Sequence, residues 1–226
     1  MDQREATLSQ QQSAPTISRR AYNALTFGLV TVSFLILWGT YTFASGGGLQ
    51  RTFSGAGGIV ALIGSFVLTI VGIVLMSVGK KKQSVGLSLA GYTVFSLTFG
   101  VTVSLVLERY SIGTITYAFG ITACISGIFL VAGVTFPEFF SRIGGILCLG
   151  LIATIVVEFV AVVFFHASQT IFDYIVIVLF CGFLGYDSYL MSSDRPTVPN
   201  AIFHASNIYL DIVNILLRVL DILDNR

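Results

Sequence analysis

The chain has 226 residues, of which 55% are hydrophobic and only 10% are charged. A soluble domain carries about 25% charged residues, so this composition excludes an ordinary soluble globular protein. The formal net charge of +1 does not point to any class of partner, and we expect no nucleic-acid binding.

Long uncharged runs predict an all-α membrane protein. Charged residues are absent from residues 21–50, 52–79, 83–107 and 110–137. Each run is long enough for a spanning helix of about 20 residues, and the apolar sequence then continues with only isolated charges. We predict a seven-transmembrane-helix bundle with spans near 22–45, 57–78, 84–107, 113–135, 143–165, 170–191 and 198–222.

The first 17 residues, MDQREATLSQQQSAPTI, are polar and rich in Gln and Ser. They contain no apolar core and no cleavage box, so they do not resemble a signal peptide. We interpret residues 1–17 as a disordered polar tail and residues 18–226 as a single transmembrane domain.

Basic residues mark one side of the predicted bundle. Arg19 and Arg20 precede the first span, and the second loop contains Lys80, Lys81 and Lys82. The positive-inside rule therefore places the N-terminus and the even-numbered loops in the cytoplasm, and seven complete crossings would place the C-terminus outside. The simplest interpretation of the three lysines is contact with water and anionic lipid headgroups.

Small side chains inside the spans indicate packing rather than chemistry. Cys124, Cys148 and Cys181 all fall within predicted spans, so we expect neither a disulfide framework nor a cysteine metal site. Glycine is frequent, and pairs such as Gly86 with Ala90 suit close contact between helices.

Polar residues repeat along one face of the last segment. They are Asn207, Asp211, Asn214, Arg218 and Asp221, at steps of four, three, four and three. At about 100° per residue they share one stripe, which must face protein or water rather than lipid. Asp211 lies near the expected bilayer centre, where a carboxylate costs roughly 2.5–3.5 kcal/mol and needs a partner, a proton or water.

A second carboxylate, Asp187, lies near the predicted cytoplasmic end of the sixth span. Taken alone, Asp187 fits a residue at a helix end, and Asp211 fits a polar residue paired only for packing. An antiparallel hairpin of the last two helices would bring both together. Two unit charges about 4 Å apart repel by roughly 4 kcal/mol at an effective dielectric of 20. Such a pair would share a proton when acidic and attract Ca²⁺ transiently when alkaline, and one of Lys80, Lys81 and Lys82 is a candidate latch for Asp187.

Four further residues allow several interpretations. Arg218 either snorkels to the interface, pairs with Asp221 or takes part in conduction. Glu158 either lines an outer vestibule or reaches the interface. Asp173, at the outer start of the sixth span, is expected to be solvated and to favour the helix dipole. His204 is expected at a loop or an interface.

The C-terminal pattern GYDSYL, a short loop and NIYLDIVNILLRVL resemble the Bax inhibitor family, also called the transmembrane Bax inhibitor motif family, in its prokaryotic form. The matching residues are Tyr186, Asp187, Tyr209, Leu210, Asp211, Asn214, Leu216, Leu217 and Arg218. ISRRAYNALTFGLV resembles the family's first helix, GKKKQSVG its second loop and AFGITACISGIF its fourth helix. The likeness covers roughly residues 17–222 and is strongest at the C-terminal end.

The resemblance implies a bundle with a central last helix and a pH-sensitive Ca²⁺ leak through a paired-aspartate sensor. The sensor would be Asp187 and Asp211, with Asn207, Asn214 and Arg218 as the supporting stripe. A monomer is implied, in a bacterial cytoplasmic membrane by preference and an organelle membrane as the second choice. Prokaryotic relatives often carry an acidic residue inside helix two and an arginine as the latch, and this chain has neither.

Two other functions compete with a leak channel or exchanger. One is a non-conducting regulator that binds another membrane protein, such as a membrane-anchored protease, and the polar tail would suit that role. The other is an intramembrane aspartyl protease, which needs Gly-x-Gly-Asp, whereas Ile208, Tyr209 and Leu210 precede Asp211. Motifs for enzyme activity are lacking, so we expect no enzyme and no cofactor. The expected partners are the lipid bilayer, Ca²⁺ and protons, with a membrane protein as a further candidate.

Overall fold

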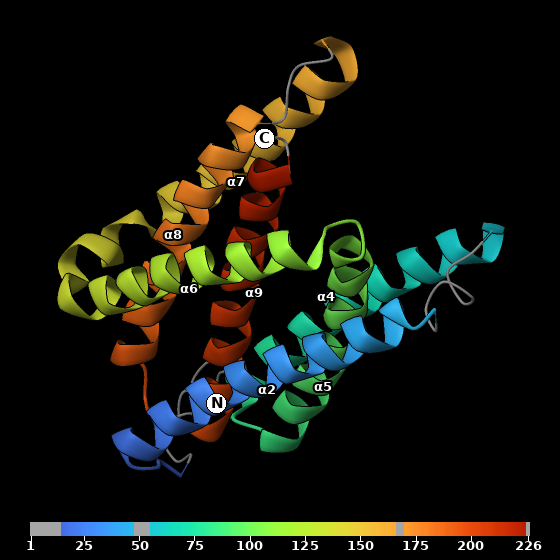
Figure 1. Cartoon of the computed structure of the whole chain (residues 1–226). Coiled ribbons are helices and arrows are strands. Elements are labelled where there is room, and N and C mark those ends of the chain that lie inside the picture. The colour runs from blue at the N-terminus through green and yellow to red at the C-terminus, as the bar shows by residue number, and fades with distance from the viewer. Residues whose placement is uncertain (1–14, 48–54, 166–169, 225–226) are drawn as a thin grey trace. The chain divides into compact units, whose positions relative to one another are not determined.

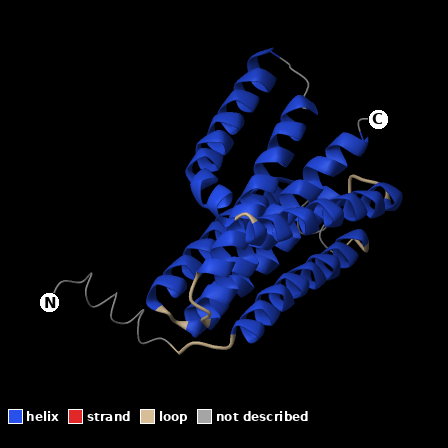
Figure 2. Cartoon of the chain, turned by 90° about the vertical axis from the view of Figure 1, so that its left-hand side faces the viewer, coloured by secondary structure: helices blue, strands red, loops and turns tan. Residues whose placement is uncertain are grey.

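The computed structural model describes residues 15–47, 55–165 and 170–224. The first 14 residues of the predicted polar tail therefore lie outside the described part. The described residues form seven α-helices and no strand (Figures 1 and 2). The helices are α2 (Arg19–Ser45), α4 (Gly55–Lys82), α5 (Val85–Leu107), α6 (Ile112–Thr135), α7 (Pro137–Phe165), α8 (Thr170–Ser193) and α9 (Val198–Asp224). Each predicted span thus corresponds to one helix, and the all-α fold class is confirmed.

Serine caps and one proline set where several helices begin. Ser18, Ser84 and Ser111 precede α2, α5 and α6, and each hydroxyl accepts a hydrogen bond from a backbone amide in the first turn. Helix α7 begins at Pro137, earlier than the predicted start near 143. Proline is favoured at the first helical position, and the negative charge of Glu138 in the first turn complements the helix dipole. The charged residues before 143 are therefore compatible with a helix that begins at Pro137.

Six of the described helices are long and apolar enough to cross a membrane, and α9 is the exception. Helix α7 buries only Phe140 and Leu147 inside the protein. Large apolar side chains on the rest of α7, such as Phe159, are exposed in the absence of lipid. A soluble protein does not expose so much contiguous apolar surface, so these faces are suited to a hydrocarbon environment.

The chain divides into two compact units. The first comprises Met1–Arg109 and Asp194–Ser206, and the second comprises Tyr110–Ser193 and Asn207–Arg226. Helix α9 contributes residues to both units, and no residue from Val198 to Leu223 is exposed. The polar stripe lowers the hydropathy of α9, which explains why it is not among the apolar spans. Its central position in the bundle and its complete crossing stay predictions.

In the first unit, α5 packs against α2 and α4. One close approach lies at Gly91 of α5, where an added Cβ would be 2.7 Å from the backbone oxygen of Gly72 in α4. Only glycine allows the two backbones to come so near. The predicted contact at Gly86 is wrong, because an added Cβ there meets no atom within 4 Å and Ala90 is exposed.

Hydroxyl groups join the same helices. Thr69 of α4 contacts Thr98 of α5 with an Oγ1–Oγ1 distance of 2.9 Å, and Ser65 contacts Thr102 at 3.2 Å. Each of these four hydroxyls also lies 2.8–3.0 Å from a carbonyl oxygen of its own helix. Hydroxyl pairs of this kind hold helices together in lipid, where the hydrophobic effect does not.

In the second unit, α8 packs against α6 and α7. Gly133 of α6 lies against the backbone of Gly185 in α8, which leaves no room for a Cβ. Nearby, the Ser188 hydroxyl donates a hydrogen bond to the Leu130 carbonyl oxygen over 2.7 Å. These contacts fix the turn of α8 that carries Asp187.

Candidate functional site

The two aspartates predicted as a sensor lie together in the second unit. Asp187 on α8 is 8% exposed and Asp211 on α9 is 4% exposed. Their side chains are joined by a hydrogen bond. A carboxylate can only accept hydrogen bonds, so a bond between two carboxyl groups requires that one of them holds a proton.

The described surroundings of Asp211 supply little compensation for a second negative charge. Asp211 Oδ2 is buried and accepts no hydrogen bond from the described residues. Asn214, one turn along α9, donates its amide hydrogen to the Leu210 carbonyl oxygen over 2.8 Å and so bonds within its own helix. Asn207 is half-buried. Within the described chain, no three His, Cys, Asp or Glu side chains are grouped to hold a metal ion, so Ca²⁺ at this pair would need water ligands.

Arg218 forms the centre of a second cluster in the same unit. Its Nη1 lies 2.8 Å from Asp173 Oδ1 on α8 and 3.2 Å from Glu158 Oε1 on α7. Asp173 is 1% exposed, so the prediction that it is solvated is wrong, because the guanidinium compensates its charge inside the protein. The Oδ1 atom of Asp221, a predicted partner of Arg218, instead accepts a hydrogen bond from the Tyr110 hydroxyl.

A third cluster lies in the first unit around Lys80. Lys80 Nζ is 2.7 Å from Asp194 Oδ2, in the loop between α8 and α9, and 4.5 Å from the centre of the Phe203 ring. Lys81 and Lys82 are exposed, which is consistent with the headgroup role predicted for them. Lys80 thus has an acidic partner that the sequence did not indicate, and the pairing of a lysine with Asp187 stays a prediction.

His204 on α9 is the third member of the Lys80 cluster. Its side chain is fully buried, and Nε2 lies 2.8 Å from the same Asp194 oxygen. Nδ1 is buried without a hydrogen-bond partner among the described residues. A carboxylate accepts and does not donate, so the hydrogen belongs on Nε2 and the neutral ring leaves Nδ1 as an unsatisfied acceptor. His204 therefore lies in a helix rather than in a loop, and its position at the membrane interface stays a prediction.

Asp194 remains ionised at physiological pH. Burial alone would raise its pKa, but hydrogen bonds from His204 and Lys80 and the charge of Lys80 outweigh burial and lower the pKa from 3.8 to about 2. Sequence reasoning missed this role, because Asp194 and Lys80 are far apart in the chain. The available signal in the sequence was the short loop with Asp194 and Arg195, followed by His204 in an otherwise apolar segment.

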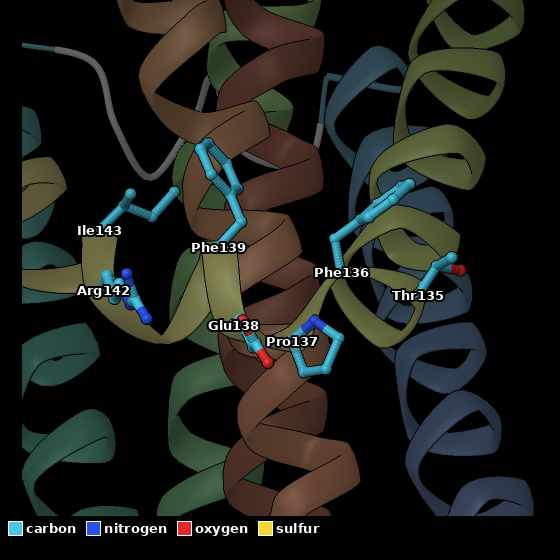
Figure 3. A pocket seen from close by; sticks show the side chains of 7 residues that line it. All are labelled: Thr135, Phe136, Pro137, Glu138, Phe139, Arg142 and Ile143. Atoms are coloured by element: carbon cyan, nitrogen blue, oxygen red, sulfur yellow. The ribbon is translucent and has the colours of Figure 1, made fainter.

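Two cavities lie away from the aspartate pair. One, of about 160 Å³, is in the first unit and is lined by Lys80, Gln83, Asp194, Arg195, Thr197 and Asn200. The other, of about 700 Å³, lies in the second unit at the α6–α7 turn, where Phe136, Glu138 and Arg142 line it (Figure 3). Neither Asp187 nor Asp211 lines either of these two cavities.

The sequence is similar to one family over nearly its whole length. The family model described as "Inhibitor of apoptosis-promoting Bax1" matches residues 14–226. The chain is 26% identical to the inner membrane protein YbhL of Escherichia coli (strain K12) over 223 residues, which cover 93% of this chain and 92% of YbhL. It is 27% identical to an uncharacterized protein of Borreliella burgdorferi over 237 residues, which cover 96% of this chain and 97% of that protein.

Proposed function

The chain belongs to the Bax inhibitor family of membrane proteins, and from that premise we propose that it is a pH-sensitive leak channel or exchanger for cations, Ca²⁺ above all. The observation that supports this proposal is the hydrogen-bonded pair of buried carboxyl groups at Asp187 and Asp211. Buried ionisable residues in membrane-spanning segments are costly and are typical of ion and proton pathways.

The pair can respond to pH because its two protonation states favour different geometries. With one shared proton, the carboxyl groups bond to each other and hold α8 against α9. Loss of that proton leaves two negative charges, which repel by roughly 4 kcal/mol at 4 Å and an effective dielectric of 20. Separation of the helices, entry of water or binding of a divalent cation would each relieve this repulsion. The proposed pathway therefore opens as the pH rises.

The proposed location is a bacterial cytoplasmic membrane. The protein is an integral, multi-pass membrane protein of this family, and the E. coli relative is named as an inner membrane protein. The exposed lysines Lys81 and Lys82 support a cytoplasmic position of the α4–α5 turn.

The test is Ca²⁺ flux into liposomes that contain the purified protein, at roughly pH 6, 7 and 8. Wild type is compared with Asp187→Asn and Asp211→Asn, which keep the side-chain size and remove the charge. Flux should rise with pH in wild type and lose most of its pH dependence in both variants. Glu138→Gln is a matched control, because Glu138 is an exposed carboxylate on α7, and it should behave as wild type.

Absence of flux above that of empty liposomes at every pH, with folded protein, would overturn the leak proposal. A non-conducting regulator of another membrane protein would then be favoured. Deletion of residues 1–14 separates the two functions further, since a leak should tolerate the deletion and a regulator that uses the polar tail should not.

A further inference from the structure

We propose that the cavity of about 160 Å³ in the first unit is a binding site for a phosphate group, supplied by a lipid headgroup or by a free phosphate. The cavity lies between the α4–α5 turn, the α8–α9 loop and the first turn of α9. The proposal goes beyond the leak function and does not depend on it, because neither Asp187 nor Asp211 lines this cavity.

Among the described residues, only polar and charged ones line the cavity, although 55% of the chain is hydrophobic. A water molecule takes about 30 Å³ in the liquid, so the cavity has room for roughly five waters or for one phosphate group. Pockets for drug-sized ligands measure roughly 300–1,000 Å³. The size and the lining therefore favour a small and strongly polar ligand. The lining residues are Lys80, Gln83, Asp194, Arg195, Thr197 and Asn200.

The charge of the lining favours an anion. Lys80 Nζ lies 2.7 Å from Asp194 Oδ2, so these two charges compensate each other. Arg195 then leaves the lining with one net positive charge. Thr197 precedes α9 and Asn200 lies in its first turn, so the cavity is at the positive end of the dipole of a 27-residue helix. Both contributions attract an anion and oppose the entry of a cation.

The lining also carries hydrogen-bond donors that suit phosphate oxygens. The Lys80 ammonium has three N–H groups, one of which is donated to Asp194. The guanidinium of Arg195 presents a planar fork of N–H groups, which matches the geometry of a phosphate. The Thr197 hydroxyl oxygen accepts a hydrogen bond from the Asn200 backbone N–H over 3.4 Å, and its own proton can be donated to a ligand. Three side chains thus offer donors to a single anion.

Side-chain amides hold this lining in place. Gln83 donates one amide hydrogen to the Lys80 carbonyl oxygen over 2.7 Å and the other to Asn200 Oδ1 over 3.0 Å. The Asn200 amide in turn donates to the Arg195 carbonyl oxygen over 2.9 Å. Gln83 has a φ of 51°, in the left-handed region that few residues other than glycine adopt. These bonds join the three segments around the cavity, so the site is formed before a ligand binds, which lowers the entropic cost of binding.

The first arm of the experiment tests free phosphate. Equilibrium binding of radiolabelled inorganic phosphate is measured on the full chain in a maltoside detergent, which contains no phosphate. Arg195→Gln should weaken binding by about tenfold or more, because it removes charged hydrogen bonds to the ligand. Arg20→Gln makes the same chemical change at an exposed residue of α2 that does not line the cavity, and it should bind phosphate as wild type does.

The second arm tests a lipid headgroup. Native mass spectrometry counts the phosphatidylglycerol molecules that each variant retains, with diacylglycerol of the same acyl chains as the probe without a phosphate. Wild type and Arg20→Gln should retain phosphatidylglycerol in preference to diacylglycerol, and Arg195→Gln should lose about tenfold of this preference.

A further readout covers the case in which Arg195→Gln is less stable than wild type. Each protein is compared with its own ligand-free state, and the phosphate concentration that raises its melting temperature is determined. Arg195→Gln should need about tenfold more phosphate for the same rise. Arg195→Lys keeps the charge but not the planar fork, so its requirement should lie between the two.

Dependence on Arg195 in the first arm alone would identify a free phosphate as the ligand, and in the second arm alone a lipid headgroup. Dependence in both arms would mean that the site accepts either source. Equal losses in Arg195→Gln and Arg20→Gln would overturn the inference, because attraction to surface charge would then explain the binding. Wild type that binds neither probe better than Arg195→Gln would overturn it as well. Neither result bears on the leak proposal, which is tested by flux.

Discussion

Replacement of Asp194 by Asn should destabilise the protein by a pH-independent amount around neutrality. The two bonds from Lys80 and His204 lower the pKa of Asp194 from 3.8 to about 2. That difference corresponds to about 2.5 kcal/mol at 1.36 kcal/mol per pKa unit. The side chain is 33% exposed, and solvent screening reduces the expected loss to about 1–2 kcal/mol.

The sign of the pH dependence follows from the lowered pKa. A carboxyl group with a lower pKa in the folded state stabilises the fold above its unfolded pKa, and this stabilisation is lost as the pH falls from 3.8 toward 2. The difference between wild type and Asp194→Asn should therefore be the same at roughly pH 8 and pH 5 and shrink only in stronger acid.

Thermal unfolding in detergent, followed by circular dichroism, measures this difference. A loss of about 1–2 kcal/mol lowers the melting temperature by about 2–8 °C for a chain of this size. Lys80→Met should cause a similar loss, and the double variant should lose less than the sum. Lys81→Met, at an exposed neighbour, is the control with no expected change. A penalty that disappears between pH 7 and pH 5 would refute the reasoning, because a group other than Asp194 would then control the cluster.

Three further changes test the packing of the first unit by the same unfolding measurement. Gly91→Ala should cost about 1–3 kcal/mol, because its Cβ would overlap the backbone of α4 at Gly72. Gly86→Ala, where nothing lies within 4 Å, should instead stabilise α5 by about 0.5–1 kcal/mol, and equal effects at the two glycines would contradict the crossing described here. Tyr92→Phe removes the 2.6 Å hydrogen bond from the Tyr92 hydroxyl to the Leu29 carbonyl oxygen. This change should lower the free energy of unfolding by about 1 kcal/mol. An unchanged melting temperature would mean that the bond contributes nothing to stability.

The helices could be predicted because apolar length and charge spacing are local properties. The apolar runs located all seven helices, and the main error was the start of α7, where Pro137 and Glu138 favour an early helical turn. The proximity of Asp187 and Asp211 was also predictable, since a short loop between two long helices leaves an antiparallel hairpin as the simplest arrangement.

The ion pairs could not be predicted because they depend on how distant segments pack. Arg218 had a local candidate in Asp221, yet its partners come from α7 and α8. Likewise, Lys80 pairs with a loop residue that no periodic pattern connects to it. The sequence showed that these charges needed compensation, whereas the identity of each partner required the tertiary structure.

The hydroxyl contacts between α4 and α5 make this helix interface easy to rearrange. Each hydroxyl has one proton, which it can give either to its partner across the interface or to a carbonyl oxygen of its own helix. Separation at Thr69 and Thr98 therefore leaves no donor unsatisfied in lipid, and such bonds contribute only about 0.6 kcal/mol each. The crossing at Gly72 and Gly91 does not have this freedom, because its backbones are already in contact. Helix α4 is therefore held at Gly72 and Gly79, where α5 leaves no room for a Cβ, while the hydroxyls of Thr69 and Thr98 can exchange partners without loss of a hydrogen bond.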